Sequence, residues 1–186
     1  MKFHLFNMSL IIFLIIILTK CNINKNPFFS YNTNIIKNSS FEINGNTSIK
    51  YWFVNNTQIP YFDNDTPPDG GKWSLYLKAN WYAPLPKSPS YLVPLPSGEH
   101  LLNLSLWGKY KTIHGSAFLI LKNNDERNIV GQIDIIDTSW TYYSRVDRVR
   151  INANDSLFVL LFGGGDELLY GETHFDLVEL KLIHDK

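Results

Sequence analysis

The sequence contains a single cysteine, Cys21, among its 186 residues. One thiol cannot close an intramolecular disulfide, and it cannot supply a zinc site built from several cysteines. The five histidines are scattered, without the spacing of zinc ligands. The folded part of the chain must therefore be stabilised by core packing, with or without a metal ion held by oxygen ligands.

The sequence also lacks an excess of either charge, because 17 basic side chains balance 17 acidic ones. Nucleic-acid-binding proteins normally carry a basic patch, so we expect no nucleic-acid partner. Asp63, Asp65 and Asp69 lie close together, but prolines interrupt any calcium-loop pattern, which favours a solvated turn.

Motifs of catalysis are missing as well, since there is no Gly-x-Ser-x-Gly and the only cysteine lies near the N-terminus. We therefore expect a protein without catalytic residues. Two carboxylates for glycoside hydrolysis are defined by their separation in space, so a hydrolase is kept as the less favoured alternative.

The first 20 residues have the pattern of an export signal. Lys2 gives a basic start, and residues 10–18 form an unbroken apolar run. This pattern is typical of a signal peptide, and the run is shorter than the about 20 residues of a transmembrane helix. We expect residues 1–20 to be the signal peptide. A tilted membrane anchor that begins near Leu5 is the alternative.

Cys21 follows Leu18-Thr19-Lys20, a stretch that resembles a bacterial lipoprotein box. Lys20 departs from that motif, in which a small residue usually precedes the cysteine. The resemblance implies a lipid on Cys21, a membrane partner through that lipid, and a place at the cell envelope. An ordinary secretory signal would instead give a secreted protein. Residues 21–33 are rich in Asn and indicate a spacer, followed by one domain over 34–184.

The body of the chain shows almost no helical periodicity. Residues 102–107 and 174–183 alternate between apolar and polar side chains, and residues 157–162 are continuously apolar. Stretches rich in Pro and Gly, at 63–71 and 83–96, separate such segments. Short alternating segments with turn signals between them predict an all-β fold, a two-sheet antiparallel sandwich.

Three groups of segments, in this order along the chain, carry a resemblance to a known family. They are residues 34–42 followed by Trp52, residues 70–75 with 95–107, and residues 140–143 with 174–180. Together they resemble the galactose-binding-like jelly roll, especially carbohydrate-binding modules of the family 4 and 9 type. The resemblance covers roughly residues 34–183 and implies a jelly roll that binds a ligand.

The same resemblance implies a structural calcium ion between the first and last strands. The positions that match its side-chain ligands are Glu42 and Asp176, with backbone carbonyls near Ser40 and Lys72 in addition. Carboxylates and carbonyls are the oxygen ligands that calcium takes. Asp176 also has two apolar neighbours, and a carboxylate in an apolar strand needs a partner or a cation. Solvent or a backbone hydrogen bond is the alternative partner.

A sugar site needs an aromatic plane with polar groups at its edge. Because Leu102, Leu104 and Leu106 are expected to face the core, alternation turns Trp107 and its polar neighbours to the opposite side. The residues predicted to form the ligand platform are Trp107, Tyr76, Asn103, Ser105 and Lys109, with Trp81 and Tyr82 as a rim. The alternative is that Trp107 packs under the proline-rich loop. We assign Trp52, Trp73 and Trp140 to the core.

These patterns predict an exported, monomeric, non-catalytic protein whose partner is a polysaccharide or oligosaccharide. A protein-interaction or assembly module on the same fold, without a sugar site, is the main alternative. An exposed apolar patch in place of a polar-edged platform would favour it.

Overall fold

The computed structural model describes residues 30–54, 60–79, 88–165 and 169–184, and the stretch from Tyr31 onward forms one compact unit. Trp81, Tyr82 and Cys21 lie outside the described residues. Within the described ranges, no helix is long and apolar enough to cross a membrane. The strands are β1 (Glu42–Ile43), β2 (Asn46–Thr47), β3 (Tyr61–Asp63), β4 (Ser74–Ala79), β5 (Ser90–Val93), β6 (Gly98–Tyr110), β7 (Ser116–Asn123), β8 (Glu126–Asp134), β9 (Thr141–Ile151), β10 (Asp155–Phe162) and β11 (Gly171–Leu182).

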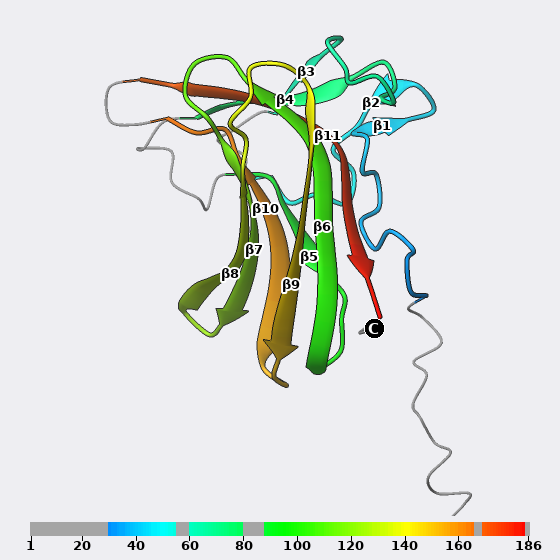
Figure 1. The fold of residues 1–186 in the computed structure, drawn as a ribbon, viewed down its shortest axis with the longest axis vertical. Helices are drawn as coiled ribbons and strands as arrows, with labels where there is room; N and C mark the ends of the chain where they lie inside the picture. The colour runs from blue at the N-terminus through cyan, green and yellow to red at the C-terminus, as the bar shows by residue number, and fades with distance from the viewer. Residues whose placement is uncertain (1–29, 55–59, 80–87, 166–168, 185–186) are drawn as a thin grey trace, which may run out of the picture. The chain divides into compact units, whose positions relative to one another are not determined.

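Two main antiparallel sheets build the compact unit. One has four strands in the order β5-β10-β7-β8, and the other has five in the order β3-β4-β11-β6-β9. Figure 1 shows β6 and β9 side by side, with β7 and β8 in the other layer. The prediction of an all-β, two-sheet antiparallel sandwich is confirmed.

The core lies between these sheets and follows from the alternation along each strand. Leu102, Leu104 and Leu106 of β6 are fully buried, as the sequence pattern predicts. Leu119 of β7 and Val159 of β10 are fully buried as well. Burying one such side chain stabilises the fold by about 1.5–3 kcal/mol, so this inward set decides which way every strand faces.

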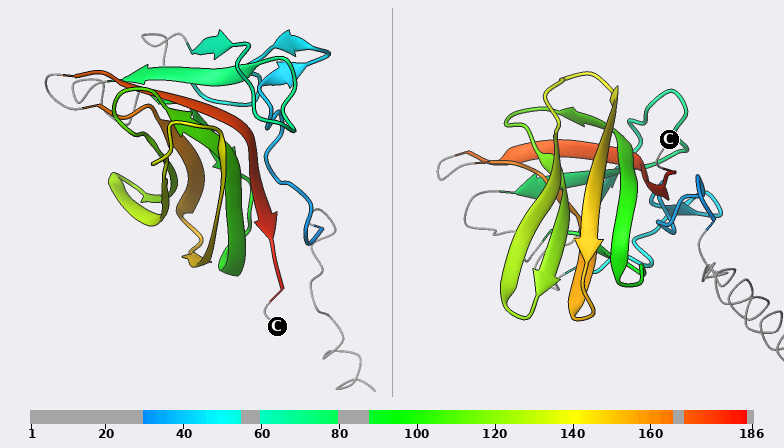
Figure 2. Two further views of the ribbon diagram at one scale, coloured as in Figure 1. Left: turned by 45° about the horizontal axis from the view of Figure 1, so that its top comes forward. Right: turned by 60° about the horizontal axis from the view of Figure 1, so that its bottom comes forward.

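The last strand is bent by an irregularity halfway along it. The register of β11 against β6 shifts between Asp176 and Glu179, and Leu177 between them has a left-handed φ of 48°. A bulge of this kind bends a strand, and Figure 2 shows β11, in red, turning sharply. The first half of β11 pairs with β4. Beside its second half the backbone of Asn32, expected in the spacer, donates to Leu182 over 2.9 Å.

The phenol of Tyr91 in β5 joins the N-terminal segment to the four-stranded sheet. Its hydroxyl donates to the Ile35 carbonyl over 3.1 Å and accepts from the Lys37 backbone nitrogen over 3.3 Å. Tyr91→Phe is expected to lower the free energy of unfolding by about 1–2 kcal/mol, because two backbone groups lose their partner. Urea unfolding measures it. Tyr142→Phe, at an exposed ring, is the control, and equal midpoints would contradict the prediction.

Candidate functional site

The outer face of the five-stranded sheet carries a row of side chains that runs across the strands. Tyr61 of β3 lies opposite Tyr76 of β4, and Tyr76 lies opposite His174 of β11. His174 in turn lies opposite Lys109 of β6. Trp140 precedes β9 directly and reaches the same row from the loop before that strand. One row therefore collects residues that are far apart in the sequence.

The rings in this row touch one another in sequence across the sheet. The ring centroids of Tyr61 and Tyr76 are 5.9 Å apart, and Tyr76 stacks on His174 at 4.8 Å. The indole of Trp140 meets His174 edge-on at 6.1 Å. We call these four residues the aromatic row. Such pairs each contribute about 0.5–1.5 kcal/mol beyond burial, so the row holds its shape before any ligand arrives.

His174 is the buried centre of the aromatic row. Its Nε2 donates a hydrogen bond of 3.1 Å to the carboxylate of Asp63, while Nδ1 has no hydrogen-bond partner among the described residues. Burial lowers the pKa of His174, the Asp63 hydrogen bond opposes that shift, and the charges of Lys111 and Lys109 lower the pKa further. The imidazole is therefore neutral at pH 7 and acts as a spacer between the tyrosines and Trp140.

Trp140 was assigned to the core from its sequence context, and that prediction is wrong. Its ring is only half-buried, and its Nε1 donates to the carboxylate of Asp65 over 2.9 Å. The ammonium of Lys109 lies 5.2 Å from the centre of the same ring. Asp65, from the loop after β3, and Lys109, from β6, thus hold the indole, and the pairing of Gly108 with Thr141 brings Trp140 beside Lys109.

Lys109 is predicted to be an edge contact for a ligand, but its ammonium group is already paired with a carboxylate of the protein. Only 9% of the residue is exposed, and its ammonium forms an ion pair with Asp65. Ser105, another predicted edge contact, is buried, so it offers no hydroxyl to a ligand. Both lie on the predicted face of β6, but sequence alternation cannot show what covers a side chain.

Asp63 and Asp65 were interpreted as part of a solvated turn, and instead both reach into the aromatic row. The backbone of Asp65 is fixed by Ser74, whose hydroxyl donates to the Asp65 carbonyl over 2.7 Å. The hydrogen bond from His174 lowers the pKa of Asp63. Burial opposes ionisation of Asp65, but hydrogen bonds from Lys109 and Trp140 outweigh it and lower its pKa. Both carboxyl groups are charged at neutral pH.

A further ion pair closes the same face beyond Tyr76. Lys78 and Glu172 lie opposite each other on β4 and β11, with 3.2 Å between their charged atoms. Burial and the hydrogen bond to Glu172 raise the pKa of Tyr76 to about 12. Burial opposes ionisation of Glu172, but hydrogen bonds from Tyr76 and Lys78 outweigh it and lower the pKa of Glu172. A carboxyl group with a lowered pKa is ionised at neutral pH and is therefore a poor general acid there.

Trp107 lies in the next row of the same face. It is half-buried, sits opposite Tyr142 of β9 and meets that ring at 5.8 Å in an edge contact. Tyr142 is 52% exposed. Asn103, two steps along β6 from the buried Ser105, accepts a hydrogen bond of 2.8 Å from Ser144. Trp107 and Tyr142 therefore form a second aromatic surface beside the aromatic row.

The two predicted calcium ligands, Glu42 and Asp176, approach the same turn. A side chain built on Gly70 would meet the Asp176 Oδ2 atom at 2.6 Å, and one built on Gly71 would overlap the Glu42 carboxylate. Glu42 also accepts from the backbone nitrogen of Trp73 over 2.5 Å. Two adjacent glycines thus leave room for two carboxylates at one point.

Asp176 is fully buried, and no described residue offers a hydrogen bond to its Oδ2. Burial raises its pKa to about 7, with a smaller contribution from the charge of Glu42. No group of three or more His, Cys, Asp or Glu side chains suited to a metal occurs in the described part of the chain. A cation here would need backbone oxygens as well, and Ser40 and Lys72 lie two residues before Glu42 and directly after Gly71.

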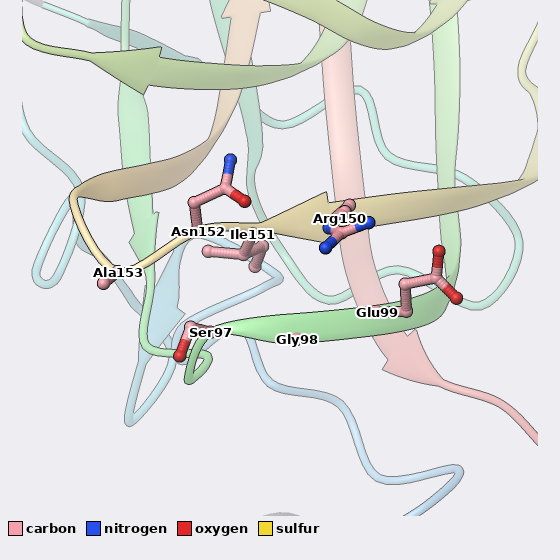
Figure 3. A pocket seen from close by; sticks show the side chains of 7 residues that line it. All are labelled: Ser97, Gly98, Glu99, Arg150, Ile151, Asn152 and Ala153. Atoms are coloured by element: carbon pink, nitrogen blue, oxygen red, sulfur yellow. The ribbon is translucent and has the colours of Figure 1, made fainter.

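A separate hollow of about 580 Å³ lies at the other end of β6, where Figure 3 shows its lining. Glu99 and Arg150 face each other there across β6 and β9. None of the described residues that line it is aromatic. Because it lies at the opposite end of β6 from Trp107 and Lys109, it is separate from the aromatic surfaces.

The chain was compared with known proteins. No family model and no curated protein matches the sequence. Solved structures do. A xylan-binding domain, the first family 22 carbohydrate-binding module of Xyn10C from Paenibacillus barcinonensis, has a TM-score of 0.55 at 14% identity, over 80% of this chain and 94% of that one. A family 16 carbohydrate-binding module has a TM-score of 0.56 at 18% identity, over 79% and 99%.

The fold is a β-sandwich jelly roll like that of these modules. The modules named above belong to families 22 and 16, so they support the expected module-like jelly roll, while the finer resemblance to families 4 and 9 stays a prediction. The same jelly roll matches the enzymatically active domain of tailspike protein 4 from bacteriophage CBA120, with a TM-score of 0.55 at 18% identity, over 81% of this chain. This chain spans only 21% of that one. At such identities the likeness establishes the jelly-roll fold, and function must be argued from the site.

Of the remaining tryptophans in this jelly roll, Trp52 is buried as predicted and packs on Phe41 at 5.3 Å. Trp73 is only half-buried, so its assignment to the core is wrong, as it is for Trp140. The alternation along β11 carried a signal for His174, because the neighbouring Phe175 is a core residue and period two turns His174 outward. No comparable signal marked Trp140, which precedes its strand.

Proposed function

We propose that this protein is a non-catalytic carbohydrate-binding module that binds a polysaccharide or oligosaccharide on the outer face of its five-stranded sheet. The aromatic row and the Trp107–Tyr142 surface provide ring planes for sugar faces. Hydroxyl, amide and carboxylate groups beside them provide partners for sugar hydroxyls. Sugar sites combine these two features. Sugar-binding modules among the similar structures support the proposal.

The observation that carries the proposal is the preorganised indole of Trp140. It is half-exposed, hydrogen-bonded to Asp65 and placed over Lys109. A ring that is already held in place loses little conformational entropy on binding, which favours affinity. Trp107 presents a second indole on the same face.

Affinity electrophoresis of the full chain through gels that contain xylan, β-glucan, galactan or mannan tests the proposal. At least one polysaccharide is expected to retard the folded protein relative to a gel without polysaccharide. A folded protein that no gel retards would contradict the proposed function. That result would favour the protein-interaction alternative.

One observation does favour that alternative as a second candidate. Phe118, Ile120 and Leu160, on β7 and β10, form a separate apolar cluster whose members are themselves buried, at 5–7% exposed. Leu92 and Ile129, beside this cluster on β5 and β8, are exposed. Exposed apolar side chains that continue a patch are typical of protein contacts. The outer face of the five-stranded sheet carries the aromatic row and the Trp107–Tyr142 surface, and we call it the aromatic face. It has more of the polar groups that a sugar requires, so sugar binding is the preferred function.

The proposal includes a calcium ion held by Glu42 and Asp176, with backbone carbonyls near Ser40 and Lys72. The buried, unpartnered Asp176 Oδ2 and the glycine turn beside it fit such an ion. Calcium takes six to eight oxygen ligands, so the ion would bring β11, Glu42 and the turn before β4 together. The ion would be structural, because neither carboxylate belongs to the aromatic row.

Export completes the proposal. A signal peptide over residues 1–20 and a lipid on Cys21 would place the domain at the cell envelope, and without the lipid it would be secreted. The Asn-rich spacer would then separate the anchor from the binding face. Palmitate labelling of the full chain and of Cys21→Ser distinguishes the two forms.

A further inference from the structure

Resting on the proposed function, we propose that the aromatic face selects uncharged glycans and that Asp65 is the residue that determines this selectivity. Asp65 keeps Lys109, a nearly buried cation of this face, from pairing with a carboxylate of an acidic glycan. The aromatic rings would bind either kind of sugar. The pairing of Lys109 with Asp65 decides which of the two kinds of glycan the face prefers.

Each lysine around the aromatic row already faces a carboxylate. Lys109 pairs with Asp65, and Lys78 pairs with Glu172 at 3.2 Å. Lys111 lies 3.8 Å from Asp63. Among the described residues that flank the aromatic row, these three cations are matched by three anions, so this part of the face has no excess positive charge to attract a polyanion.

Lys109 differs from the other two lysines in its burial. Its side chain is 11% exposed, whereas that of Asp65 is 45% exposed. Asp65 therefore lies above Lys109, on the side from which a ligand would approach, and its carboxylate takes the place that a uronate would occupy. Both of its oxygens are used, one by Lys109 and one by the Trp140 indole.

The position of Asp65 is built into the fold. Ser74 donates to the Asp65 carbonyl over 2.7 Å, and the Asp65 nitrogen donates to the Asp63 side chain over 3.3 Å. The same loop continues to Gly70 and Gly71, next to Glu42 and Asp176. Moving Asp65 aside for an acidic ligand would break these contacts. The fold without ligand therefore already keeps acidic glycans from reaching Lys109.

Asp65→Asn is the discriminating variant, because the amide keeps an oxygen for the Trp140 indole and removes only the charge. The probes are glucuronoxylan and its carboxyl-reduced form, which share one backbone and differ only in charge. We expect the wild-type full chain to prefer the carboxyl-reduced form. Asp65→Asn should narrow that preference about five-fold, the size expected for losing one partly exposed ion pair.

Two further variants keep the test independent of any single substitution. Asp65→Asn combined with Lys109→Met removes both charges and should restore the wild-type preference. Asp125→Asn, in the exposed turn between β7 and β8, changes the net charge equally without touching the face and should leave the preference as in wild type. The effect of Asp65→Asn on the preference should disappear in high salt, because salt screens the charge of the unpaired Lys109.

The outcomes separate this inference from the proposed function. Equal wild-type affinity for both forms of the glycan, or an unchanged preference in Asp65→Asn, overturns the role of Asp65 and leaves sugar binding standing. Absence of binding to either form, together with no retardation by any polysaccharide, overturns the proposed function and this inference with it. The inference is supported if Asp65→Asn narrows the preference for the carboxyl-reduced form and the added Lys109→Met substitution restores that preference.

Discussion

Trp140→Ala is expected to weaken glycan binding by at least 30-fold, or about 2 kcal/mol, the loss typical of a central aromatic residue in a binding surface. The indole is held in place by a hydrogen bond to Asp65 and by the ammonium of Lys109. Alanine removes the plane under the sugar and leaves the Asp65–Lys109 ion pair in place. Isothermal titration with the polysaccharide that retards the wild type measures the change.

The control for this prediction is Phe53→Ala. Phe53 is 62% exposed and bridges to Ser90 of the four-stranded sheet, so it is as accessible as a site residue but lies outside the aromatic face. Trp107→Ala is expected to lose about tenfold in affinity, since its ring rests on Tyr142. If Trp107→Ala and Trp140→Ala both bind as tightly as the wild type, the assigned face is wrong.

Calcium is expected to raise the free energy of unfolding by about 2.7 kcal/mol at a concentration of 100 times its Kd, because it binds only the folded arrangement of Glu42 and Asp176. The glycine turn brings these carboxylates together, and the unfolded chain does not. Thermal unfolding should shift upward on addition of calcium and downward after treatment with a chelator. Magnesium should have less effect, since it demands a tight octahedral shell and keeps its waters.

Asp176→Asn separates a bound ion from a general salt effect. The amide keeps the size of the side chain but removes one of the two carboxylates, so the calcium-dependent shift should vanish. Asp125→Asn removes a carboxylate from an exposed turn and should keep the full shift. A shift that survives in Asp176→Asn would show that any calcium binds elsewhere. No shift in the wild type would contradict the site.

Much of the fold was predictable because it depends on local pattern. The three leucines of β6 alternate with polar residues, and one face of a buried sheet must be apolar, so their direction follows from sequence. The pairing of Glu42 with Asp176 came from the family resemblance. Nothing local connects two residues so far apart, and the structure places both at the Gly70–Gly71 turn.

The candidate site was predicted only in part, because it also depends on contacts between residues that are far apart in the sequence. Tyr76 and Trp107 lie on the expected face, while Ser105 is covered and Lys109 is paired. Trp140 was missed because it precedes its strand and has no alternation to orient it. Cross-strand rows are assembled by register, which sequence patterns leave open where both faces carry polar residues.

The amino-acid sequence alone determined which side chains of each strand face inward, because burying apolar surface dominates the energy of a sheet and the side-chain period is two. It could not determine which outward residues become neighbours. Strand register, the bulge in β11 and the loop that carries Asp65 decided that in three dimensions. Contacts between residues such as Asp65 and Trp140 exist only once the sheet has formed, since no local pattern links positions 75 residues apart.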